Sequence, residues 1–210
     1  MARVLESKCK ACRREGAKLF LKGVRCNTEK CAFVKRPRGP GQHVRRVTKK
    51  TSYYAQQLRE KQKVKRIYGV LDRQFKRFFK LASKSKGVTG KMLVQILERR
   101  LDNVLYRSLF SLSRSQARQL VLHGFVFVDS KRVNIPSFFV KEGQVIELKG
   151  KTSMISDVKG NIEINTKERS VPSWINIDKD KLKISVLRLP QKDDLTIAIN
   201  EQLIVELYSK

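Results

Sequence analysis

The segment Ser113–Val128, with the sequence SRSQARQLVLHGFVFV, changes from a helical to an extended pattern within a few positions. Ser113 is followed three residues later by Gln116, and together they form a capping box, a signal for the start of a helix. Gly124 suits the left-handed conformation that ends a helix, and the β-branched and aromatic run after it favours a strand. The segment therefore predicts a short helix that leads directly into a β-strand.

Further elements are expected on both sides of this segment. A turn at 129–130 and a returning strand at 132–133 would complete a hairpin, and residues 145–148 predict another strand. Together these elements predict a small α+β unit. The other expected elements are helices at about 52–68, 70–85 and 90–106, where apolar residues recur with the helical period, and short strands at 162–164 and 182–184.

Positive charge is concentrated in the first half of the chain. The 210 residues include 47 Lys and Arg against 19 Asp and Glu, a formal net charge of +28. Residues 1–100 hold 30 of these cations and 6 of the acids, which gives +24, whereas residues 101–210 hold 17 and 13, which gives +4. Such an excess repels itself unless a polyanion lies against it. The charge therefore favours a nucleic-acid partner over an anionic membrane, and no apolar run approaches the ~20 residues that span a bilayer.

Four cysteines occur as two close pairs, Cys9 with Cys12 and Cys26 with Cys31. No apolar segment follows the first charged residues of the N-terminus, so we expect a cytoplasmic protein in which these cysteines do not form disulfides. Their spacing lets four thiolates converge on one tetrahedral zinc ion with no position left open for water. We therefore expect one structural zinc, with four ordinary reduced cysteines as the alternative. His43 is a candidate substitute ligand, although its place in a Pro-Gly loop favours an RNA contact.

These observations together predict an α+β protein. We expect a mainly helical body with an N-terminal zinc knuckle and an inserted small α+β RNA-binding module that has a short antiparallel sheet. The expected divisions are a zinc knuckle and basic loop at 1–50, the first part of the helical body at 51–98, the module at 99–160, and a C-terminal segment at 161–210 that completes the helical body.

Basic residues form three clusters, at 8–50, 59–86 and 114–132. Arg and Lys give affinity for RNA by neutralising phosphates, without selecting a base sequence. Arg114 and Arg118 are four residues apart, so we expect them to share one exposed helix face, with a solvated surface as the alternative for any single pair. The candidate RNA-contacting residues are Arg13, Arg14, Lys22, Arg36, Gln42, His43, Arg59, Lys61, Lys63, Lys65, Arg66, Arg73, Lys76, Lys84, Lys86, Arg114, Arg118, Lys131 and Arg132.

Two segments resemble motifs found in enzymes, but neither has the spacing that its chemistry requires. Gly150-Lys151-Thr152 resembles the end of a phosphate-binding loop, but the glycine required five positions earlier is Val145. Asp193 and Asp194 are adjacent carboxylates, and the side chains of adjacent residues point in different directions. We therefore expect no catalytic activity.

Seven stretches resemble the bacterial small-subunit ribosomal protein S-four family in its cysteine-containing form. They occur in the family's order over essentially the whole chain, and the middle part resembles the RNA-binding module named after that protein. The stretches are RREG at 13–16, PGQH at 40–43, LREKQK at 58–63, RIYG at 66–69, RLDNV at 100–104, SQARQLV at 115–121 and LIVELYS at 203–209.

The resemblance implies a structural ribosomal protein that is a primary binder of small-subunit ribosomal RNA. It implies a grip on a multi-helix junction in the 5′ domain of that RNA and a role in nucleating assembly of the subunit body. It also implies contacts with neighbouring ribosomal proteins that influence translational accuracy, and a place beside the channel by which messenger RNA enters. The residues that fall where the channel-facing segment is expected are Arg45, Arg46, Lys49 and Lys50.

The chain departs from the family pattern at three places. Val44 and Leu109 stand where the family commonly has glycine, and Asp129-Ser130 replaces the usual Asn-Gly of the hairpin turn. An RNA-modifying enzyme that uses the same module for targeting is the alternative function, but the 60 residues after Gly150 are too few for a catalytic domain. A zinc-dependent DNA-binding regulator would need a recognition helix after the cysteines, and none is expected there.

Overall fold

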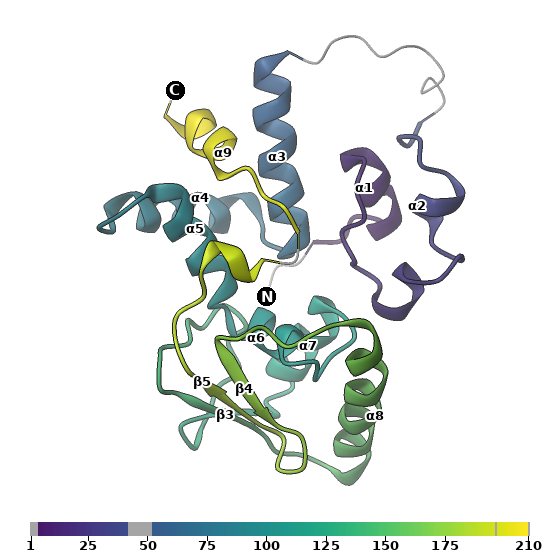
Figure 1. The fold of residues 1–210 in the computed structure, drawn as a ribbon, viewed down its shortest axis with the longest axis vertical. Helices are drawn as coiled ribbons and strands as arrows, with labels where there is room; N and C mark the ends of the chain where they lie inside the picture. Colours follow the sequence, from purple (N-terminus) through teal and green to yellow (C-terminus); the bar gives the residue numbers. More distant parts are fainter. Residues whose placement is uncertain (1–3, 42–51, 196, 210) are drawn as a thin grey trace. The chain divides into compact units, whose positions relative to one another are not determined.

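The computed structural model describes residues 4–41, 52–195 and 197–209 (Figure 1). The chain divides into two compact units. Unit 1 comprises Met1–Leu93 and Thr196–Lys210, and unit 2 comprises Val94–Leu195. Within the described ranges, no helix is both long and apolar enough to cross a membrane.

Unit 1 begins with three short helical segments, α1 (Lys8–Glu15), the 3-10 helix η1 (Gly23–Cys26) and α2 (Ala32–Lys35). Gly16 ends α1 in the left-handed conformation, with a φ of 65°. The carboxylate of Glu15 is buried and forms ion pairs with Arg59 and Arg66 of α3 (Tyr53–Ile67). These ion pairs fasten the N-terminal segment to the helical part of unit 1.

The remaining helices of unit 1 are α4 (Asp72–Lys84) and α9 (Glu201–Tyr208), and α5 (Thr89–Glu98) begins in unit 1 and ends in unit 2. α9 lies alongside α3 (Figure 1), where Gln57 Nε2 donates a hydrogen bond of 3.1 Å to the carboxylate of Glu206. The ring of Phe79 on α4 stacks on Tyr208, with the centroids 4.4 Å apart. The apolar residues of this core that are fully or almost fully buried include Val64, Ile67, Val70, Phe75, Phe78, Ala82 and, on α9, Ile204.

Unit 2 is an antiparallel sheet packed against helices. Its helices are α6 (Leu101–Arg107), α7 (Arg114–Leu122), α8 (Thr152–Glu168) and the 3-10 helix η2 (Lys192–Asp194). Its strands are β1 (Val126–Val128), β2 (Lys131–Arg132), β3 (Val145–Leu148), β4 (Ile175–Asp178) and β5 (Lys183–Val186), in the order β2-β1-β3-β5-β4.

One face of the sheet is apolar and buried because side chains alternate along each strand. Val126 pairs with Leu148 and Ile146 pairs with Ile184, so these buried residues share that face. Buried residues of α6, α7 and α8 complete the same core, together with Trp174, whose side chain is fully buried.

The structure confirms the expected α+β fold class and the antiparallel sheet. Ser113 caps α7 by accepting a hydrogen bond from Gln116 N at 3.3 Å, and Gly124 follows the helix with a φ of 74°, as expected. The strand expected at 162–164 is wrong, because these residues lie within α8. The strand expected at 182–184 overlaps β5, and β4 and β5 both join this sheet.

Candidate nucleic-acid interface

The four cysteines belong to one small region built by α1, η1 and α2. Cys9 and Cys12 come from α1, Cys26 ends η1, and Cys31 precedes α2; all four are free thiols, and Cys9 alone is only half-buried. Burial raises the pKa of Cys12 and of Cys26, and the charges of the neighbouring thiolates raise the pKa values further. The backbone N–H of Lys22 donates to Cys26 Sγ at 3.3 Å.

These thiols match a zinc site in chemical type and number, and N–H···S hydrogen bonds are typical outer contacts of thiolate ligands. Among the residues that the structure describes, however, no three His, Cys, Asp or Glu side chains form a group spaced to hold a metal ion. The zinc knuckle therefore stays a prediction.

The basic residues of α3 are paired with acids of the same chain. Arg59 and Arg66 contact Glu15, Lys63 contacts Glu60 at 3.2 Å, and Lys61 and Lys65 lie 3.0 and 3.9 Å from Asp72. The side chains of Lys61 and Arg66 are only 12% and 16% exposed. Partial burial by itself would raise the pKa of Asp72, but Lys61, Lys65 and Lys76 outweigh it and leave that pKa below its ordinary value. These cations therefore help to hold unit 1 together.

Other candidate cations of unit 1 are exposed. These are Arg14, Lys22, Arg36, Arg73, Lys76, Lys84 and Lys86. Arg13 is half-buried and donates to the backbone oxygens of Arg38 at 2.8 Å and Gly39 at 3.3 Å, so it holds the chain after α2. Six candidates lie outside the described residues, namely Gln42, His43, Arg45, Arg46, Lys49 and Lys50.

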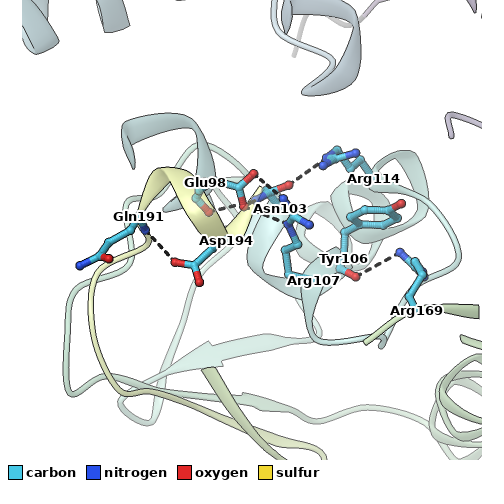
Figure 2. Close-up of polar contacts among 8 residues, drawn as sticks. All are labelled: Glu98, Asn103, Tyr106, Arg107, Arg114, Arg169, Gln191 and Asp194. Carbon is cyan, nitrogen blue, oxygen red and sulfur yellow. Dashed lines mark hydrogen bonds and ion pairs between the residues drawn. The ribbon is translucent and has the colours of Figure 1, made fainter. Parts of the chain in front are cut away.

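Arg114 in unit 2 is more enclosed than the sequence suggested. Its Nε donates to Asn103 Oδ1 at 2.8 Å, and its guanidinium group lies 4.3 Å from the centre of the Tyr106 ring. Asn103 in turn donates to the carboxylate of Glu98 at 2.8 Å (Figure 2). Arg114 therefore touches a buried polar network directly, and the expectation of a freely exposed face does not hold for it.

Arg118 is also half-buried, and Nη1 lies 3.7 Å from Asp102 Oδ2. Burial lowers the pKa of Arg118, and the carboxylate of Asp102 acts in the opposite direction. Asp102 is itself held by Arg100, whose Nε lies 3.0 Å from Oδ1. Contact of Arg114 and Arg118 with RNA stays a prediction, but both residues also have a structural role.

Arg132 stabilises the end of α7. Its guanidinium donates to the backbone oxygens of Gly124 at 2.8 Å and His123 at 3.2 Å. These are carbonyls at the C-terminus of a helix, where a cation is favourable. The neighbouring Lys131 is exposed.

Arg169 and Asn165, at the end of α8, were not expected to take part in this region. The Arg169 guanidinium lies 4.2 Å from the centre of the Tyr106 ring, so Tyr106 has Arg114 and Arg169 above and below it in Figure 2. Asn165 Nδ2 donates to Leu109 O at 2.7 Å and to Ser111 O at 3.2 Å. No local pattern in the sequence could show these contacts, since each joins residues more than 50 positions apart.

Asp193 and Asp194 do not form a carboxylate pair of catalytic type. Asp194 accepts hydrogen bonds of 2.9 Å from both Nη1 and Nη2 of Arg188 and one of 2.8 Å from Gln191 N, whereas Asp193 is exposed. Asp194 therefore closes the turn after Pro190.

The whole length of the chain is similar to known ribosomal proteins. Residues 3–98 match the model of the ribosomal protein S4/S9 N-terminal domain, and residues 99–146 match that of the S4 domain. The chain is 53% identical over its full length, and that of the relative, to the small ribosomal subunit protein uS4 of Solidesulfovibrio magneticus. The corresponding proteins of Dictyoglomus turgidum and Thermoanaerobacter sp. are 52% and 50% identical, again over the full length of both chains. The chain belongs to the uS4 family.

Two departures from the family pattern have a visible backbone consequence. Leu109, Asp129 and Ser130 have φ values of 68°, 48° and 66°, in the region that favours glycine. The chain therefore adopts at these positions a backbone conformation that favours glycine, and at Asp129 side-chain hydrogen bonds hold it. Asp129 accepts hydrogen bonds from Gln144 Nε2 at 2.7 Å and Val145 N at 3.0 Å. The third departure, Val44, lies outside the described residues.

Proposed function

We propose that this chain is a structural, non-catalytic protein of the small ribosomal subunit that binds ribosomal RNA. The observation that carries the proposal is a sequence identity of 53% and 52%, over the full length of both chains, to two relatives named small ribosomal subunit protein uS4. The excess charge of +24 on residues 1–100 supports it, because binding to a polyanion removes the self-repulsion of such a region.

In finer detail, the proposed target is a multi-helix junction in the 5′ domain of small-subunit RNA. By binding it early, the protein would nucleate assembly of the subunit body. Neighbouring ribosomal proteins are the further partners, through contacts that influence translational accuracy. The last proposed partner is messenger RNA, which would pass Arg45, Arg46, Lys49 and Lys50 in the channel by which it enters the subunit.

One structural zinc bound by Cys9, Cys12, Cys26 and Cys31 is also part of the proposal. Three of these thiols are buried in a region with few apolar side chains, and four thiolates would give a closed tetrahedral site. Such a site supplies folding energy and leaves no position for a reacting molecule. The zinc would therefore shape the N-terminal segment that carries much of the basic charge.

Binding to a transcript of the 5′ domain tests the proposed function. We expect tight binding that weakens steeply with salt, with a slope of log K against log salt near −9 if roughly ten phosphates are neutralised. The comparison is a random DNA duplex of equal length at moderate salt. Equal affinity for both nucleic acids would contradict the proposal, as would a failure of the protein to co-sediment with small subunits.

A further inference from the structure

The outward face of α4 carries a row of basic side chains. Arg73, Arg77, Lys80 and Lys84 are all exposed and follow one another at intervals of four, three and four residues. These intervals place successive side chains on one face of an α-helix. The row spans about 16 Å along the axis, from a rise of ~1.5 Å per residue.

The opposite face of α4 is apolar. Phe75, Phe78 and Ala82 are buried, and each stands two residues from a member of the basic row, which is about half a turn of helix. Packing of this apolar face in unit 1 therefore directs the basic row to solvent.

Acidic side chains are missing from this part of the sequence. Between Arg73 and Leu97 the chain has seven Lys and Arg and no Asp or Glu. The nearest acid along the chain is Asp72, 3.9 Å from Lys76, whose side chain is still 60% exposed. In the described part of the chain, Arg73, Arg77, Lys80 and Lys84 form no ion pair.

The contrast with α3 separates two kinds of cation. Each of the five α3 cations expected from the sequence to contact RNA lies within ion-pair distance of an acid of the same chain. They are Arg59, Lys61, Lys63, Lys65 and Arg66. Charge that is neutralised internally attracts a polyanion less than unpaired charge does. The positive charges of Arg73, Arg77, Lys80 and Lys84 are therefore not neutralised by acids among the described residues, and a partner can bind them.

We propose that the face of α4 formed by Arg73, Arg77, Lys80 and Lys84 binds the sugar–phosphate backbone of RNA directly. This inference rests on the proposed function and assigns one surface to it, including two residues, Arg77 and Lys80, that are not among the RNA-contacting residues expected from the sequence. The row contains no aromatic side chain on which a base could stack, so it recognises phosphates and not base sequence. A protein partner is less well matched, since charged residues as a class are depleted at the cores of protein interfaces and the row has no apolar member.

The test compares two full-length variants with the same loss of charge. R73Q/R77Q/K80Q removes three cations from the row, and glutamine preserves the helix propensity. K159Q/K167Q/K181Q removes three exposed lysines from α8 and from the turn between β4 and β5. Binding to the 5′-domain transcript is measured over a range of salt concentrations, and circular dichroism checks that each variant is folded.

We expect the α4 variant to bind more weakly, with a salt slope shallower by about 3, or roughly one for each phosphate that is no longer neutralised. Its deficit should therefore be largest at low salt and shrink as salt rises. The control variant should keep nearly the wild-type affinity and slope. R73K/R77K/K80R, which conserves the charge, should also bind as the wild type does.

Three results would overturn the inference. Wild-type binding by the α4 variant would remove this face from the RNA interface. Equal weakening of both glutamine variants would show an effect of net charge alone. Normal RNA binding with failed incorporation into reconstituted small subunits would assign the face to a protein partner. Wild-type protein that does not bind the transcript would instead refute the proposed function itself.

Discussion

Glu98 and Arg107 form a buried, two-pronged ion pair in unit 2, with Arg107 Nε 3.0 Å from Glu98 Oε2 and Nη2 2.9 Å from Oε1 (Figure 2). Their side chains are 1% and 5% exposed. Asn103 donates to the same carboxylate, so its charge is well satisfied. The ion pair ties the end of α5 to the end of α6.

Replacement of Arg107 by Met should lower the free energy of unfolding by about 3–5 kcal/mol, because it leaves the carboxylate of Glu98 buried without its partner. Urea unfolding followed by circular dichroism measures the change. The double variant R107M/E98L should recover part of the loss, since no uncompensated charge remains. A single variant as stable as the wild type would show that the pair adds nothing to unit 2.

Local signals in the sequence were enough to predict α7 and β1. The capping box at Ser113 and the left-handed Gly124 each act within a few residues, so the sequence carries them explicitly. α8 was not predicted because its buried stripe is discontinuous. Met154, Val158 and Ile162 are followed by Asn165, a polar residue whose buried side chain makes hydrogen bonds instead of apolar contacts. A short alternation at 162–164 then imitated a strand.

The sequence predicted which basic residues could form the interface, but not which of them are exposed and unpaired enough to contact RNA. A sequence shows that α3 and α4 are both basic, but not that Glu15, some 44 positions before Arg59, pairs with α3. It likewise places Arg114 on a helix surface but cannot show that Asn103 and Tyr106 enclose its guanidinium. Contacts between distant residues depend on the tertiary fold, so exposure could only be judged from the structure.

The hairpin turn between β1 and β2 offers a matched pair of substitutions. Ser130→Gly should stabilise unit 2 by about 0.5–1 kcal/mol, because Ser130 is exposed and its φ of 66° strains any residue with a Cβ. Asp129→Gly should not stabilise it, since the hydrogen bonds to Gln144 and Val145 are removed. Thermal unfolding of both variants measures the difference. An equal gain from both would mean that the Asp129 side chain contributes nothing.

Removal of metal should affect the N-terminal segment selectively. We expect about one zinc per chain by elemental analysis, and faster proteolysis within residues 1–50 after chelation, because metal binding supplies folding energy there. Unit 2 serves as an internal control, and its fragments should stay equally resistant. Cys12→Ser should reproduce the effect of the chelator without any chelator present. A metal-free preparation whose N-terminal segment resists protease as well as the untreated protein would contradict the zinc site.

Acid should weaken the turn closed by Asp194. Burial by itself would raise the pKa of this carboxyl, but hydrogen bonds from Arg188 and Gln191 outweigh it and leave the pKa below its ordinary value. A carboxyl with a lowered pKa in the folded state contributes stability above its unfolded value of about 3.9, and this contribution is lost as the pH falls through the lower, folded value.

Asp194→Asn should therefore cost about 1–2 kcal/mol at neutral pH, where the charge-assisted hydrogen bonds are removed, and progressively less below about pH 4. Urea midpoints of wild type and variant between pH 3 and 7 measure this convergence. Asp193→Asn is the matched control, because Asp193 is adjacent but exposed, and it should leave the profile unchanged. If the stabilities of the wild type and Asp194→Asn differed by a constant amount at every pH, titration of Asp194 would not explain the loss of stability. The loss would then come from the replacement of the carboxylate by an amide, independent of its charge.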